Sequence, residues 1–182
     1  MGLGPTPSQT VGPFFGFALP YRDDHRLVDP DHPAAVRVEG QVVDGAGEPV
    51  PDALVEIWQA GPDGRYPGPE ADGSGFAGFG RCGTDAEGAF RFVTLKPGPV
   101  AGQDGRPQAP HVHVTVFARG LLRQVRTRMY FPDEAEANAA DPVLGLVEDE
   151  RARSTLVARD DGGVLRFDVH LQGDRETVFF AL

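Results

Sequence analysis

The segment from His111 to Phe117 reads His-Val-His-Val-Thr-Val-Phe, with a strict period of two. Side chains of a β-strand alternate between the two faces, so this period predicts a strand with its valines on one face. His111 and His113 then share the opposite face, where two imidazoles can bind the same metal ion. The segment therefore favours a sheet protein and marks a candidate metal site.

Similar short runs recur along the chain with turn residues between them. Val36, Val38 and Val42 alternate with polar residues from Ala35 onward. Further strands are expected in five segments, namely Ala53–Trp58, Phe90–Phe92, Gln124–Tyr130, Thr155–Ala158 and Val164–Leu171. The last two flank Asp160-Asp161-Gly162-Gly163 and predict a hairpin. The pattern indicates an all-β protein built as an antiparallel β-sandwich with short helices. The best helix candidate follows Asp133, a plausible N-cap.

The first 34 residues differ from the rest of the chain in composition and in hydrophobic periodicity. Residues 1–34 are rich in Pro and Gly and show no periodicity, so we expect an extended N-terminal arm and irregular segment. Prolines in the arm disfavour a helix. Phe14 and Phe15 need burial, either against the chain's own domain or against a partner chain. Residues 35–182 are expected to form the β-sandwich domain.

Composition excludes several classes of partner. The formal net charge is −10, which argues against nucleic acid because phosphate contacts need a basic surface. Cys82 is the single cysteine, so an internal disulfide is excluded and a reducing cytoplasm is expected. The sequence has no apolar run of membrane-spanning length and no basic start followed by an apolar stretch, so neither membrane insertion nor a signal peptide is expected.

An ordered set of short motifs resembles the intradiol ring-cleavage dioxygenases. The matching pieces are Glu56-Ile57-Trp58-Gln59-Ala60, Gly64-Arg65-Tyr66, Gly78-Phe79-Gly80-Arg81, Thr84-Asp85-Ala86-Glu87-Gly88, Lys96-Pro97-Gly98-Pro99 and His111-Val112-His113. Each piece is weak alone, but their order and spacing together are specific. The resemblance runs from about residue 6 to the C-terminus and implies the β-sandwich of that family, which is also related to transthyretin-like folds.

The resemblance also implies a metal site that this chain has partly lost. Enzymes of the family hold Fe³⁺ with two tyrosines and two histidines, since anionic phenolates favour the ferric state. The matching positions are Tyr66, His111 and His113, but the second tyrosine corresponds to Val100. An arginine expected three residues before the first histidine is Gln108. We therefore expect no bound metal and no catalytic residue on this chain, with Tyr66, His111 and His113 as vestigial ligands.

Some members of the family are built from two homologous chains, and this sequence resembles their iron-free α chain. That likeness implies a homologous β subunit that carries Fe³⁺, within a large αβ hetero-oligomer. The enzyme so formed converts 3,4-dihydroxybenzoate and O₂ to 3-carboxy-cis,cis-muconate. Thr10, Gly12, Pro13 and Arg128 are implied to line the substrate pocket. Arg128 suits a benzoate carboxylate, Arg126 is a possible substitute on the same strand face, and a surface salt bridge remains the alternative for either.

Two other functions stay open from the sequence. In the first, Tyr66, His111, His113 and solvent bind iron, and the chain is a self-sufficient dioxygenase. In the second, the chain is a non-enzymatic β-sandwich binding module, because a fold alone does not fix a function.

Overall fold

Strands make up most of the regular backbone, and the helices are few and short. The computed structural model describes residues 4–68, 76–102 and 105–181. The elements in chain order are α1 (Phe15–Ala18), β1 (Ala35–Val43), β2 (Leu54–Gln59), β3 (Phe79–Gly83), β4 (Ala89–Leu95), β5 (Val100–Ala101), β6 (Pro107–Gln108), β7 (His111–Phe117), β8 (Val125–Tyr130), α2 (Ala135–Ala140), η1 (Leu144–Leu146), α3 (Glu150–Ser154), β9 (Arg159–Asp161), β10 (Val164–Arg166) and β11 (Val169–His170). The expected β-rich fold with short helices is confirmed. In the described part of the chain, no helix has the length and apolarity needed to cross a membrane.

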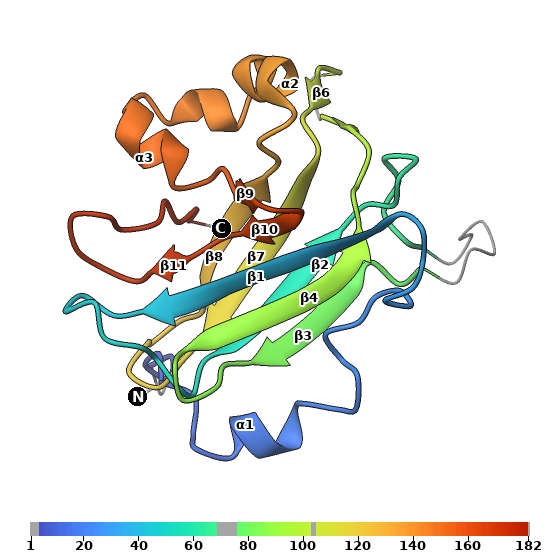
Figure 1. Ribbon diagram of the computed structural model, residues 1–182. Coiled ribbons are helices and arrows are strands. Elements are labelled where there is room, and N and C mark those ends of the chain that lie inside the picture. The colour runs from blue at the N-terminus through green and yellow to red at the C-terminus, as the bar shows by residue number, and fades with distance from the viewer. Residues whose placement is uncertain (1–3, 69–75, 103–104, 182) are drawn as a thin grey trace.

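Two larger sheets organise the chain (Figure 1). One is the antiparallel sheet β3-β2-β7-β8. The other has the order β11-β1-β10-β9, with β4 also paired to β1. In this second sheet β10 and β11 lie one after the other beside β1, and both run parallel to it. The prediction of purely antiparallel pairing is therefore wrong here. The first strand after the helices, β9, pairs antiparallel with β10 and so runs against β1, and the turn at Gly162 and Gly163 brings β10 into the direction of β1.

One apolar cluster joins the inner faces of the two sheets. Val38, Val42, Phe90 and Phe92 from one sheet share it with Val55, Ile57, Val112, Val114, Val116 and Met129 from the other. Gln59 adds a buried polar link, since its amide donates to the Leu95 carbonyl at 2.8 Å and its oxygen accepts from Thr94 at 2.7 Å. The period-2 prediction for β7 is confirmed in its bounds and in its three buried valines.

The C-terminal hairpin is confirmed, but its first strand is displaced. Gly162 and Gly163 adopt positive φ values at its turn, and β9 pairs antiparallel with β10. The predicted strand Thr155–Ala158 is not part of this hairpin. Thr155 instead closes α3, where its hydroxyl donates to the Ala152 carbonyl, and Val157 forms an isolated bridge to Tyr130.

The predicted cap of the second helix is wrong. Helix α2 begins at Ala135 and its N-cap is Glu134, whose side chain makes no capping hydrogen bond. Asp133 instead accepts from the Lys96 ammonium at 2.7 Å. A cationic partner distant in sequence outcompetes the local backbone N–H groups for this carboxylate.

The N-terminal segment lies along the sheets rather than apart from them (Figure 1). Thr10 Oγ1 accepts from the Gly120 N–H at 2.8 Å, Arg81 donates to the Leu19 carbonyl at 2.7 Å, and Leu27 packs against the core. The short helix α1 contradicts the expectation that prolines exclude a helix there, because Phe15–Ala18 contains none. The division at residues 34 and 35 stays a prediction.

Gly40 is a position where the packing of β1 permits no side chain. A Cβ there would overlap the main-chain oxygen of Phe167, which belongs to the segment between β10 and β11. We predict that Gly40→Ala lowers the free energy of unfolding by about 3 kcal/mol, as overpacking against backbone does. Urea denaturation measures this loss.

Gly83→Ala is the matched control for this prediction. Gly83 also lies in a strand, but nothing lies within 4 Å of the Cβ position. Its unfolding free energy should change by less than about 0.5 kcal/mol. Equal stability of the two variants would contradict the close contact between β1 and Phe167.

Candidate functional site

The candidate site lies on the outer face of the four-stranded sheet, opposite the core. Its register aligns Trp58 of β2 with His113 of β7 and with Arg128 of β8. His111 is aligned in the same way with Tyr130. Because directly paired residues of neighbouring strands point to the same face, these polar and aromatic side chains gather while the intervening valines enter the core.

Tyr66 joins this face from the loop after β2. The Gly61 carbonyl accepts hydrogen bonds from the N–H groups of Gly64 and Gly98. Gly64 has φ +76, and a Cβ there would overlap the Pro99 carbonyl oxygen. A glycine is required at position 64 for both reasons. The ring of Tyr66 stacks on Trp58 at 5.7 Å, and its hydroxyl lies 2.9 Å from His113 Nε2. The fold thus brings together Tyr66, His111 and His113, which are far apart in sequence.

Both histidines of this cluster are neutral at pH 7. His111 Nδ1 donates to the Ala109 carbonyl at 2.7 Å, which leaves Nε2 as an acceptor 3.3 Å from His113 Nε2. Burial and then the Arg128 charge lower the pKa of His111 to about 4. The pKa of His113 is lowered to about 3, mainly by burial and then by the charges of His111 and Arg128. Burial also raises the pKa of the Tyr66 phenol, and the nearby Arg128 charge lowers it by a smaller amount.

The donor set does not suit Fe³⁺. Val100 has no donor atom, and it pairs in register with Gln108 across the small hairpin of β5 and β6. The two departures from the family pattern therefore face each other beside the Tyr66 loop. What remains is one phenol with a raised pKa, two neutral imidazoles and a nearby guanidinium. A ferric ion favours anionic oxygen donors, and the positive charge of Arg128 works against any added cation.

Arg128 is held in place by a hydrogen-bonded network. One of its Nη1 hydrogens donates to Gln108 Oε1 at 2.8 Å, and the same nitrogen lies 3.4 Å from the Tyr130 hydroxyl. Tyr130 is fully buried and donates to Asp141 at 3.1 Å. The Asp141 carboxylate, 2% exposed, also accepts from the N–H groups of Ala109, Val143 and Leu144. Sequence reasoning missed this network, since nothing local distinguishes a buried aspartate before a proline from an exposed one.

The two arginines of β8 differ in their surroundings. Arg128 is half-buried, whereas Arg126 is exposed and lies next to Thr115 in the register. Within the part of the chain that the structure describes, neither forms an ion pair, so the salt-bridge interpretation finds no support there. Arg128 is the better placed of the two to present a fixed guanidinium.

The predicted pocket residues of the arm lie far from Arg128. Thr10, Gly12 and Pro13 are exposed, and Thr10 is bonded to Gly120 beyond the end of β7. His113 and Gly120 are seven residues apart, which corresponds to roughly 20 Å along an extended strand. Within one copy of this chain, the arm and Arg128 therefore face different regions.

Comparison with known proteins places the whole chain in one family. A sequence model of the Dioxygenase family matches residues 11–173. The α chain of protocatechuate 3,4-dioxygenase from Burkholderia cepacia is 46% identical, over 98% of this chain and 98% of its own length. The corresponding α chain from Pseudomonas putida is 43% identical, over 98% and 96%. The β chain from Burkholderia cepacia is 36% identical over 75% of this chain and 63% of its own length.

Solved structures agree with the sequence comparisons. The dioxygenase domain of a dioxygenase carbohydrate-binding protein fusion from Streptomyces sp. SirexAA-E superposes with a TM-score of 0.62 and 31% identity, covering 93% of this chain and 99% of that domain. Catechol 1,2-dioxygenase from Pseudomonas arvilla C-1 gives a TM-score of 0.59 and 27% identity, covering 81% and 55% of the respective chains. From its motifs, its fold and these likenesses, the chain belongs to the intradiol dioxygenase family and is similar over nearly its full length to the α chains of protocatechuate 3,4-dioxygenase.

Proposed function

We propose that this chain is the α subunit of a ferric protocatechuate 3,4-dioxygenase, which converts 3,4-dihydroxybenzoate and O₂ to 3-carboxy-cis,cis-muconate. The observation that carries the proposal is a full-length likeness to α chains combined with an incomplete donor set, in which Val100 replaces a ligand. A homologous β chain would hold the iron, which when bound would supply the activation of the catechol ring toward O₂. This chain has no catalytic residue of its own.

The N-terminal segment is proposed to dock on the β chain. Four of its large apolar side chains are exposed in the isolated chain, namely Phe14 at 77%, Phe17 at 86%, Leu19 at 41% and Tyr21 at 55%. Aromatic side chains gathered on one exposed segment are typical of a protein interface. The two sheets, which we take as a sandwich, provide the rigid support for this segment in a large αβ hetero-oligomer.

The arm is proposed to form part of the wall of the β-chain substrate pocket. Thr10 is fixed by Gly120, and the Cβ position of Gly12 has no atom within 4 Å, so its backbone is open to a neighbouring chain. Pro13 stiffens the segment through its fixed φ. Exposure of Thr10, Gly12 and Pro13 in the single chain fits a role completed only in the assembly.

Arg128 is proposed to pair with the substrate carboxylate. A guanidinium meets a carboxylate through two parallel N–H···O bonds, and only one nitrogen of Arg128 is engaged by Gln108 and Tyr130. Its charge also offsets the net charge of −10 for an anionic substrate.

One observation favours the self-sufficient enzyme as a second candidate. His113 Nε2 lies 2.9 Å from the Tyr66 hydroxyl and 3.3 Å from His111 Nε2, so three donors gather around one point and could share one ion. In that case the chain alone would bind iron and turn over substrate.

Iron content and substrate-dependent O₂ uptake separate the two candidates. We predict that the purified chain alone contains less than about a tenth of an equivalent of iron and consumes no O₂, because three neutral donors hold Fe³⁺ weakly. Co-expressed with its β partner, it should yield a complex with one iron per αβ pair and full activity. Stoichiometric iron and turnover in the chain alone, lost in His111→Ala, would establish the second candidate instead.

Replacement of Arg128 tests its proposed contact with the carboxylate. In the complex, Arg128→Gln should lower kcat/KM for 3,4-dihydroxybenzoate by about 10- to 100-fold, since a hydrogen bond to a charged group contributes about 1.5–3 kcal/mol. Activity toward catechol, which lacks the carboxylate, should be unchanged. Arg126→Gln is the matched control and should leave both substrates unaffected. If Arg126→Gln lowered kcat/KM for 3,4-dihydroxybenzoate and Arg128→Gln did not, the contact with the carboxylate would be assigned to Arg126.

Truncation tests the arm. Deletion of residues 1–13 should lower kcat/KM of the complex at least 10-fold while the complex keeps its size in gel filtration, because Thr10, Gly12 and Pro13 are lost but the aromatic segment stays. Deletion of residues 1–5 is the control and should have no effect. Undiminished turnover after the longer deletion would contradict a role of the arm in the pocket wall.

A further inference from the structure

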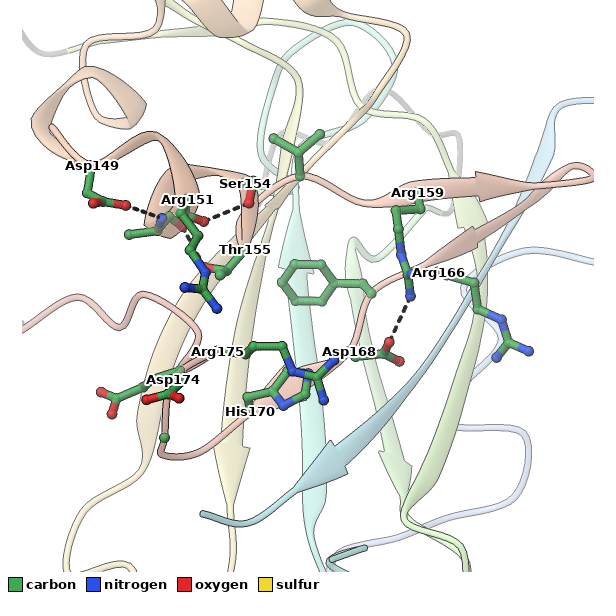
Figure 2. A pocket seen from close by; sticks show the side chains of 15 residues that line it. Asp149, Arg151, Ser154, Thr155, Arg159, Arg166, Asp168, His170, Asp174 and Arg175 are labelled. Carbon is green, nitrogen blue, oxygen red and sulfur yellow. Dashed lines mark hydrogen bonds and ion pairs between the residues drawn. The ribbon is translucent and has the colours of Figure 1, made fainter. Parts of the chain in front are cut away.

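A second site is formed by a pocket in the C-terminal part of the chain. Its volume is about 500 Å³, and its walls come from α3, the β9–β10 hairpin, β11 and residues 173–176 (Figure 2). Small-molecule sites typically have volumes of about 300–1,000 Å³. None of Tyr66, His111, His113 or Arg128 lines it, so it is separate from the site described above.

The walls of this pocket are tied together by hydrogen bonds. Thr177 and His170 exchange two of them, from Thr177 N–H to the His170 carbonyl and from His170 N–H to Thr177 Oγ1, both at 3.0 Å. Val178 N–H donates to Thr155 at the end of α3 at 3.2 Å. The C-terminal segment that carries Arg175 is therefore fixed to both β11 and α3, and the pocket is largely preformed.

Four arginines face this pocket in a chain whose net charge is −10. Two of them have carboxylate partners: Arg159 pairs with Asp168 at 3.0 Å, and Arg166 pairs with Glu39 at 3.3 Å. Arg151 and Arg175 form no ion pair with any residue that the structure describes. Figure 2 shows Arg151 reaching into the pocket from α3 and Arg175 lying beside His170. Two guanidiniums on different walls thus remain available for a ligand.

The carboxylates of the lining are only partly available to neutralise them. Asp149 is engaged in capping α3 through the Ala152 N–H, and Asp168 accepts from Arg159 and from Gln41 N–H. Asp174 and Glu176 are exposed on the rim. They cancel the long-range attraction for anions, so recognition here must come from direct pairing with the guanidiniums rather than from net charge.

The rest of the lining indicates the body of the ligand. Ala152, Val157 and Phe167 contribute apolar atoms, which favour a carbon skeleton over a bare inorganic ion. Burial and the Arg175 charge lower the pKa of His170, against Asp168, so its ring is neutral at pH 7 and can donate or accept one further hydrogen bond.

We propose that this pocket binds a small organic dicarboxylate, with one carboxylate on Arg151, the other on Arg175, and the apolar skeleton between them. Guanidinium–carboxylate pairs are bidentate and geometrically specific, so two of them select both the number and the spacing of the carboxylates. The inference is independent of the proposed function, because it uses no residue of the Tyr66 cluster or of the arm.

Titration calorimetry at low ionic strength tests this site in the assembled protein. The probes are succinate, glutarate and adipate, with hexanoate as the monocarboxylate that matches adipate in length, and inorganic phosphate. We expect one dicarboxylate per chain, bound at least 10-fold more tightly than hexanoate or phosphate. The double variant Arg151→Gln/Arg175→Gln should weaken that binding at least 10-fold. Both positions are exposed, so the fold should tolerate the change.

The double variant Arg22→Gln/Arg37→Gln makes the same charge change outside the pocket and should bind as the unmodified protein does. Equal weakening in this control would show non-specific attraction and overturn the site. Phosphate binding as tight as that of the dicarboxylates would overturn the assignment to an organic anion. Binding by the isolated chain that disappears in the assembly would show that a partner chain covers the pocket, and no saturable binding in either form would exclude the site.

Discussion

The alternation of β7 is the constraint on which the rest of the molecule depends. Val112, Val114 and Val116 enter the core shared by both sheets, and this fixes the register of β7 against β2 and β8. A slip of one residue would bury His113 and expose the valines, at a cost of several buried apolar side chains. The same register therefore sets the fold and gathers Trp58, His113 and Arg128 on the outer face.

The charges of the side chains on that outer face determine whether it can hold a ferric ion. Intradiol chemistry needs anionic donors around a ferric ion, whereas this cluster holds neutral imidazoles, a phenol with a raised pKa and a guanidinium. Loss of the donor at Val100 is accompanied by Gln108, whose oxygen accepts from Arg128. The resemblance implies an arginine at position 108 in iron-bearing chains, whereas the glutamine here supplies an acceptor. Gln108 and Tyr130 instead hold Arg128 on this face, which supports the proposal that this chain has a supporting part in the reaction.

Much of the fold was predictable because local pattern and tertiary burial agree. The strands around Val38, Ile57, Phe92 and Val114 are two-faced in sequence and in the structure. Parallel pairing of β10 and β11 with β1 was not predictable, since it joins segments near opposite ends of the chain. The Lys96 partner of Asp133 and the Asp141–Tyr130–Arg128 network join residues distant in sequence or unmarked by any pattern. Periodicity alone marked His111 and His113 as a same-face pair, whereas Tyr66 was joined to them through likeness to a family, because periodicity does not record contacts between distant segments.

The most direct test of this account is an anomalous difference map, measured at the iron absorption edge, from crystals of the complex with its β partner. The account predicts one strong peak per αβ pair, located in the β chain, and no peak beside Tyr66, His111 and His113. It also predicts that the Phe14 segment is buried against the β chain near that iron. A peak of comparable height coordinated by Tyr66, His111 and His113 would contradict it, because the chain would then hold its own metal despite Val100.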